Sequence, residues 1–218
     1  MGSILDEILQ SPNLPKYKEE IERFWQEEQR TRQGLYQSME DKSYEFINGK
    51  IYEKMSTNAE HNRIQSLLSR LLGIYVDKYQ LGRVGVDKLM ISLTRNDYEP
   101  DICFWNKAIA DQFLVDQTLF PAPDFVVEIL SKSTEKRDRG IKFNDYAAHG
   151  IAEYWLIDPQ KQVIEQYKLH KGEFQIFSTS KKAEGVMTSF TIPKFTIPAK
   201  AVFDEKSNLE TLQNLLAV

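Results

Sequence analysis

Two short apolar stretches, each with one acidic residue inside it, constrain this fold more than any other feature of the sequence. Residues 100–105 predict a β-strand that contains Asp101, and residues 124–130 predict a second strand in which Glu128 lies among valine, isoleucine and leucine. Burying a carboxylate in such a strand costs several kcal/mol unless it is paired, protonated or bound to a metal. The two strands therefore predict either a shared metal site or carboxylates at strand ends that meet basic partners.

A basic helix is predicted after the second strand, ending near His149. Asp138, Lys142, Tyr146 and His149 follow one another at steps of four, four and three, so they line one face of this helix. The helix begins where the Glu128 strand ends, and Lys142 should therefore come within reach of Glu128. Two carboxylates and a lysine suit a Mg²⁺-dependent phosphodiesterase, since oxygen ligands hold this cation and a lysine offsets developing negative charge.

The remaining elements predict an α/β fold, with a mixed central β-sheet flanked by helices. The turn Asn48-Gly49 is the strongest short signal for a hairpin. Thr57 and Glu60 have the spacing of a capping box, which would open a helix whose apolar stripe runs to Tyr75. Further helices are predicted at 16–33 and 209–216, and further strands at 82–93, 154–157, 163–169, 174–180 and 186–192.

Composition is that of a soluble globular protein. The 218 residues are 41% hydrophobic and 28% charged, which suits one domain with an appendage. No apolar run approaches the length of a membrane span, and the N-terminus has no signal-peptide pattern. The single cysteine, Cys103, excludes an intrachain disulfide and is expected to be a small buried apolar residue. We therefore expect a cytoplasmic protein with no membrane partner.

Net charge is −4, which would disfavour a nucleic-acid partner if it were evenly spread. Residues 1–40 hold five basic and eight acidic residues, so three of the four negative charges lie there. The run 131–142 instead holds five basic residues against two acidic ones. The uneven distribution of charge along the chain therefore does not exclude binding to phosphate groups.

An ordered set of motifs resembles the Uma-two family, which is assigned to the restriction endonucleases of the PD-(D/E)xK nuclease superfamily. The likeness covers about residues 42–205. The motifs that carry it are Pro100-Asp101, Val127-Glu128-Ile129-Leu130-Ser131, Asp138, Lys142, Tyr146 and the segment from Gly150 to Pro159, together with Asn48-Gly49, Glu60-His61 and 195–203.

This resemblance implies a restriction-endonuclease-like core over residues 42–205, an N-terminal helical extension over 1–41 and a C-terminal helix or tail over 206–218. It implies a DNA endonuclease that uses Mg²⁺, for which Mn²⁺ can substitute, and that acts as a homodimer. Asp101, Glu128 and the backbone carbonyl of Ile129 would be the metal ligands.

The chain departs from the superfamily at one catalytic position. The residue two places after Glu128 is usually lysine, and here it is Leu130. The resemblance implies that Lys142 replaces it, with Lys132 as the alternative. If neither amine reaches the site, the protein would be an inactive nuclease-fold module that binds nucleic acid or a protein partner.

Four further residues have both a functional and a structural interpretation. Glu60 is either a metal ligand or part of the capping box, and His61 either contacts phosphate or is a hydrogen-bonded structural residue. Asp138 either supports Lys142 or forms a surface pair, and Tyr146 either hydrogen-bonds to the site or packs in the core. Asp124, a second acid after proline, is expected to be a strand-entry residue too far from Glu128 to share a metal.

Overall fold

A computed structural model of the chain separates into two compact units. It describes residues 3–38, 43–54 and 56–217. Unit 1 comprises Met1–Lys54 and Arg95–Asp97, and unit 2 comprises Met55–Thr94 and Tyr98–Val218. The predicted boundary between residues 41 and 42 lies outside the described residues. The predicted division into extension, nuclease domain and C-terminal tail stays a prediction.

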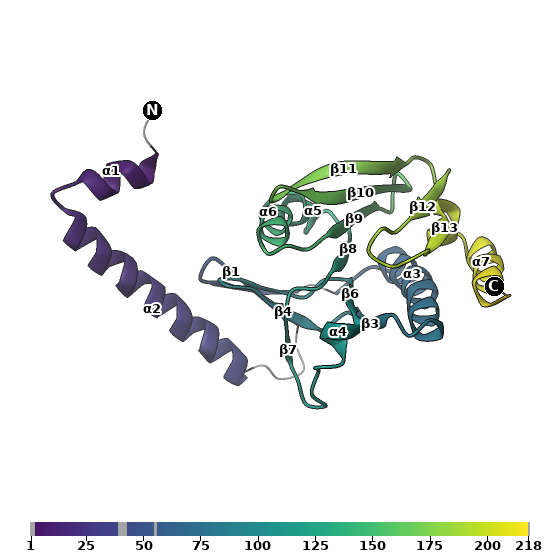
Figure 1. Ribbon diagram of the computed structural model, residues 1–218, viewed down its shortest axis with the longest axis horizontal. Helices are drawn as coiled ribbons and strands as arrows, with labels where there is room; N and C mark the ends of the chain where they lie inside the picture. The colour runs from purple at the N-terminus through teal and green to yellow at the C-terminus, as the bar shows by residue number, and fades with distance from the viewer. Residues whose placement is uncertain (1–2, 39–42, 55, 218) are drawn as a thin grey trace. The chain divides into compact units, whose positions relative to one another are not determined.

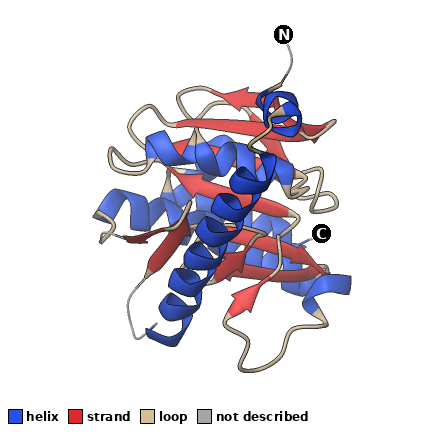
Figure 2. Ribbon diagram, turned by 90° about the vertical axis from the view of Figure 1, so that its left-hand side faces the viewer, coloured by secondary structure: helices blue, strands red, loops and turns tan. Residues whose placement is uncertain are grey.

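Unit 1 consists of two helices, a hairpin and one residue of a further strand. Its elements are α1 (Ile4–Gln10), α2 (Leu14–Ser38), β1 (Tyr44–Ile47), β2 (Lys50–Glu53) and Asp97 of β5 (Asp97–Tyr98). The helix predicted at 16–33 is longer than expected and unbroken (Figure 2). It includes Pro15, because a proline in the first turn lacks only an amide that the helix does not use. The hairpin is confirmed, with Asn48 and Gly49 at φ of 50° and 77° as a type I′ turn requires.

Ion pairs hold α2 against the rest of unit 1. Arg32 donates to both carboxylate oxygens of Asp97, and the Tyr36 hydroxyl lies 2.7 Å from Asp97 Oδ2. The buried Glu28 pairs at 3.1 Å with Arg95, whose side chain is partly exposed. Because both Arg32 and Asp97 are buried, losing one would leave the charge of the other uncompensated.

Unit 2 carries the larger part of the chain. Its elements are α3 (Ala59–Lys78), β3 (Gly82–Val86), β4 (Met90–Ser92), Tyr98 of β5, β6 (Ile102–Asn106), α4 (Lys107–Ala110), β7 (Leu119–Phe120), β8 (Phe125–Ile129), α5 (Glu135–Asp138), α6 (Ile141–Ala148), β9 (Glu153–Asp158), β10 (Val163–His170), β11 (Glu173–Ser180), β12 (Val186–Thr188), β13 (Thr196–Pro198), a 3₁₀ helix (Ala199–Val202) and α7 (Glu205–Ala217).

A six-stranded sheet, called the central sheet below, organises this unit in the order β11-β10-β9-β8-β6-β3 (Figure 1). β8 and β9 are parallel, and the other neighbouring strands are antiparallel. The predicted mixed sheet is therefore confirmed. The parallel pair is connected by α5 and α6, because parallel neighbours need a crossover connection.

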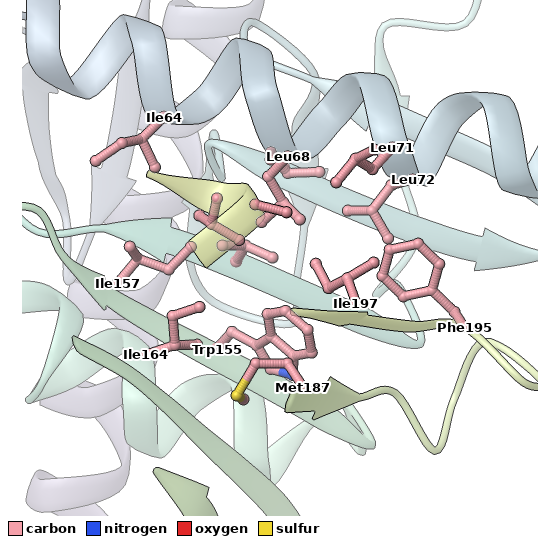
Figure 3. Packing of buried hydrophobic residues seen from close by; sticks show 14 of the residues in the cluster. Ile64, Leu68, Leu71, Leu72, Trp155, Ile157, Ile164, Met187, Phe195 and Ile197 are labelled. Atoms are coloured by element: carbon pink, nitrogen blue, oxygen red, sulfur yellow. The ribbon is translucent and has the colours of Figure 1, made fainter. Parts of the chain in front are cut away.

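Helices cover both faces of the central sheet. Ile64, Leu68, Leu71 and Leu72 of α3 form the apolar stripe predicted from the sequence, and they are buried in the core cluster of one face (Figure 3). The other side of that cluster is lined by Trp155, Ile157, Ile164, Met187, Phe195 and Ile197. On the opposite face, Phe143 of α6 packs edge-on against Tyr154, Tyr167 and Phe174.

Several local predictions are wrong, among them the strand over 186–192, which ends at Thr188. The strand predicted over 82–93 is two strands, because Asp87 and Lys88 turn the chain with φ of 50° and 45°. The capping box at Thr57 is replaced by Asn58, whose side chain accepts the His61 amide at 2.9 Å. The single basic helix is broken into α5 and α6 at Gly140, where a Cβ atom would lie 2.7 Å from the Lys136 carbonyl oxygen.

Among the helices that the structure describes, none combines the length and the apolar character that a membrane span requires.

Candidate active site

Asp101 immediately precedes β6 and does not lie within it, which corrects the predicted strand over 100–105. The ladder between β6 and β8 begins at Ile102, which pairs with Val127. Asp101 and Glu128 are therefore the residues that adjoin this first pair, one on each chain segment. The bond from the Ile129 amide to Asp101 keeps the two segments together at this point.

The Asp101 side chain is fixed by two elements besides its own strand. Asp101 Oδ2 accepts the Ile129 amide at 2.7 Å, and it lies 3.1 Å from His61 Nε2 at the beginning of α3. Gln65, one turn further along α3, donates to the Asp101 backbone carbonyl at 2.8 Å. Because Asp101 is 5% exposed, these bonds compensate for the water that it has lost.

Glu128 is held by two side chains from α6. Glu128 Oε1 accepts a hydrogen bond from Lys142 Nζ at 3.0 Å and from the Tyr146 hydroxyl at 2.8 Å. Lys142 and Tyr146 are four residues apart, so both project from the same face of the helix. The expected reach of Lys142 to Glu128 is thus what the structure shows.

Asp138 completes this cluster. Its Oδ1 atom lies 3.3 Å from Lys142 Nζ, and it is 1% exposed, so it is no surface pair. Burial raises the pKa of the neighbouring Tyr154 hydroxyl, and the charges of Glu128, Asp138 and Asp101 raise it further. Burial and then the charge of Glu128 likewise raise the pKa of Cys103, the buried thiol on this face of the sheet. The charges of these carboxylates therefore act on both neighbouring groups, the Tyr154 hydroxyl and the Cys103 thiol.

The donor set fits a divalent metal that keeps part of its water shell. Asp101 and Glu128 offer oxygen ligands, which Mg²⁺ prefers, and Mg²⁺ is usually bound by one or two carboxylates together with water and substrate phosphate. Among the described residues no group of three His, Cys, Asp or Glu side chains could hold a metal. The Ile129 amide is bonded to Asp101, and the role of its carbonyl stays a prediction.

Other predicted residues lie outside this cluster. Glu60 is exposed and pairs with Arg63 at 2.7 Å; this hydrogen bond lowers the pKa of Glu60. Lys132 is exposed in the turn that follows β8. Asp124 accepts two hydrogen bonds from the Asn106 side chain and one from its amide, which agrees with a strand-entry role. Of the two lysines considered, Lys142 is the one that the structure places against Glu128.

Sequence patterns missed two residues beside the site, Tyr98 and Asp145. Tyr98 is fully buried, and Lys142 Nζ lies 5.8 Å from the centre of its ring. Asp145, three residues after Lys142, accepts the Tyr98 hydroxyl at 2.8 Å. Period three would have added Asp145 to the predicted helix face. A two-residue strand such as β5 leaves no periodic signal.

The basic run offers fewer free cations than its composition suggests. Arg139 donates to both oxygens of Glu165, at 2.6 and 3.1 Å, and pairs with Glu135 at 3.1 Å. Burial raises the pKa of Glu165, but hydrogen bonds from Arg139 and Tyr167 outweigh it and hold that pKa below its ordinary value of 4.5. The Arg139 guanidinium therefore stabilises the fold through ion pairs and is less available to bind a phosphate.

Glu165→Gln should lower the free energy of unfolding at pH 7 by about 1 kcal/mol. A depressed carboxyl pKa stabilises the fold fully above the unfolded-state pKa, and this stabilisation is lost as pH falls through the folded-state pKa. The difference between wild type and variant should thus be constant well above the ordinary carboxyl pKa of 4.5 and disappear as pH falls through the lowered pKa of Glu165 in the folded protein. Urea unfolding across this range measures it, with the exposed Glu173→Gln as control. A difference that persists at low pH would contradict the ion-pair explanation.

The sequence and the fold were compared with known proteins. The model of the Uma2 family, described as "Putative restriction endonuclease", matches residues 33–200. Two proteins of Synechocystis sp. (strain ATCC 27184 / PCC 6803 / Kazusa) are similar. "Uncharacterized protein slr1290" is 30% identical over 172 residues, or 76% of this chain and 81% of the relative. "Uncharacterized protein sll1609" is 29% identical over 155 residues, or 69% of this chain and 85% of the relative.

A solved structure has the same fold. It is the crystal structure of "a putative nuclease belonging to DUF820" from Anabaena variabilis ATCC 29413. It aligns with a TM-score of 0.67 at 21% identity, covering 79% of this chain and 96% of the other. At this identity the likeness concerns the fold alone, and it confirms the predicted mixed α/β class.

Proposed function

Because this chain belongs to the Uma2 family, described as "Putative restriction endonuclease", we propose that it is a nuclease that hydrolyses phosphodiester bonds of DNA with Mg²⁺. The observation that carries the proposal is that Asp101 and Glu128 adjoin the first pair of the β6–β8 ladder, with Lys142 Nζ 3.0 Å from Glu128 Oε1. Two carboxylates with a lysine at hydrogen-bond distance form a set of groups suited to phosphoryl transfer.

Each group has a role that follows from its chemistry. Asp101 and Glu128 would hold the metal, which when bound polarises a phosphate oxygen and lowers the pKa of water. The Lys142 ammonium donates hydrogen bonds toward the oxygens on which negative charge develops. Tyr146 holds Glu128 Oε1, and His61 and the Ile129 amide hold Asp101 Oδ2. The carboxylates therefore stay oriented while substrate exchanges.

The amine at Glu128 favours an enzyme over the inactive nuclease-fold module. That alternative requires that neither Lys142 nor Lys132 reaches the acidic residues, and Lys142 lies between Glu128 and Asp138. DNA as substrate and a homodimer as the active form are both implied by the resemblance. Both stay predictions.

Calorimetric titration with Mn²⁺ and cleavage of supercoiled plasmid with Mg²⁺ together test the proposal. Wild type should bind Mn²⁺ and cleave. Asp101→Asn and Glu128→Gln should each weaken Mn²⁺ binding at least about tenfold and abolish cleavage, because each removes a metal ligand's charge. Asp124→Asn is the matched control: this aspartate immediately precedes β8, where it holds Asn106, and its loss should leave both measurements unchanged.

The following results would contradict the proposed enzyme or its metal site. Wild type that binds no Mn²⁺ and cleaves neither DNA nor RNA would overturn it. If that protein still bound DNA in a mobility-shift assay, the inactive nuclease-fold module would be the better description. Equal Mn²⁺ affinity in wild type and Glu128→Gln would remove Glu128 from the metal site.

A further inference from the structure

Tyr98 contacts three residues of the same face of α6. Its ring centre lies 5.8 Å from Lys142 Nζ, its hydroxyl donates to Asp145 Oδ2 at 2.8 Å, and its ring meets that of Tyr146 edge-on at 5.3 Å. The side chain is 0% exposed. One buried ring thus touches the lysine and also the tyrosine that holds Glu128.

Asp145 is itself fixed from the far side. His149 Nδ1 lies 2.7 Å from the Asp145 carbonyl oxygen and 3.1 Å from its Oδ1 atom. The Thr94 amide donates to His149 Nε2 at 3.1 Å, so this nitrogen has no proton and Nδ1 is the donor. The acceptor of the Tyr98 hydroxyl is therefore held in one orientation, and the ring has little freedom to rotate.

The face of the Tyr98 ring sets the direction of the Lys142 ammonium, which Glu128 and Asp138 alone do not fix. Two carboxylates attract the ammonium, but a flexible four-carbon chain can satisfy them in several rotamers. An aromatic face within about 6 Å attracts a cation in a defined direction and excludes water from that side. A displacement of about 1 Å at a catalytic group can cost about 100-fold in rate.

We propose that Tyr98, anchored by Asp145, is a positioning residue that sets the orientation of Lys142 at the nuclease site. This inference rests on the proposed function, in which Lys142 stabilises the developing charge. Tyr98 lies on the short strand β5 and reaches the site through Lys142 and Tyr146. Its loss should therefore change the chemical step and leave metal binding intact.

Single-turnover cleavage and Mn²⁺ titration of full-length variants test this. Tyr98→Leu should lower kcat at least about 30-fold, with KM and Mn²⁺ affinity within threefold of wild type. Tyr98→Phe, which keeps the ring and loses the anchor, should lower kcat about three- to tenfold. The matched control is Tyr75, another buried tyrosine, whose hydroxyl donates to the Pro193 carbonyl. Tyr75→Leu and Tyr75→Phe should leave kcat within twofold.

If Tyr98→Leu does not fold, a double-mutant cycle with Tyr98→Phe and Asp145→Ala still tests the proposal. Asp145→Ala should lower kcat about as much as Tyr98→Phe, and the double variant should be no slower than either single variant, since one interaction has been removed. Wild type that cleaves while Tyr98→Phe and Asp145→Ala keep full kcat, or lose it additively, overturns this inference alone. Wild type that does not cleave overturns the proposed function and this inference with it.

Discussion

Lys142→Ala should lower the rate of DNA cleavage by about 100- to 1,000-fold, the usual cost of losing a donor that stabilises charge in the transition state. Lys142 is 2% exposed and bonded to Glu128 Oε1, so bulk solvent cannot easily replace it. Single-turnover cleavage at saturating Mg²⁺ measures the loss. Lys132→Ala and Lys136→Ala are matched controls, because both lysines are exposed in the same basic run, and each should stay within about threefold.

The same substitution should also destabilise the fold in the absence of metal. It leaves Glu128 and Asp138 buried without their shared ammonium, which costs about 3–5 kcal/mol for a broken buried pair. Urea unfolding with and without Mg²⁺ separates this effect from catalysis, and the cation should restore part of the loss. If Lys132→Ala abolished cleavage and Lys142→Ala did not, the lysine of the site would have been assigned wrongly.

The parts of the site that the sequence predicts are those fixed by regular periods. Strand alternation marks Asp101 and Glu128 as acids among buried neighbours, and helical spacing puts Lys142 and Tyr146 on one face. Gly140 breaks the predicted helix, but the helical spacing still places Asp138 Oδ1 3.3 Å from Lys142 Nζ. The alternation of apolar residues in the strands likewise predicted the mixed sheet.

Contacts between segments that are distant in the sequence produce no periodic pattern and could not be predicted in this way. His61 reaches Asp101 across 40 residues, and the N-cap of its helix is Asn58 rather than the predicted Thr57. Tyr98 lies on a strand of two residues, too short for any alternation to appear. Asp87 and Lys88 adopt positive φ without glycine, so the break between β3 and β4 could not be read from composition. Tertiary packing decides each of these positions.

Glu153 belongs to the same class, since nothing in its sequence surroundings marks it as a buried carboxylate with four hydrogen-bond donors. It is 0% exposed and lies at the start of β9. Its Oε1 atom accepts from Trp155 Nε1 at 2.6 Å and Gln166 Nε2 at 2.7 Å. Its Oε2 atom accepts from Ser189 Oγ at 2.7 Å and the Thr191 amide at 3.0 Å. One carboxylate thus ties two strands of the central sheet to the chain that follows β12.

Glu153→Ala should lower the free energy of unfolding by about 3–5 kcal/mol, because four buried donors lose their acceptor together. Glu153→Gln should cost about 2 kcal/mol, since its amide nitrogen would face donors in place of one oxygen. Urea unfolding followed by tryptophan fluorescence measures both, with Glu173→Ala on the exposed start of β11 as the control within about 0.5 kcal/mol. A Glu153→Ala protein within about 1 kcal/mol of wild type would mean that water replaces the carboxylate. In that case the segment after β12 must be held by its apolar residues Ile192 and Phe195.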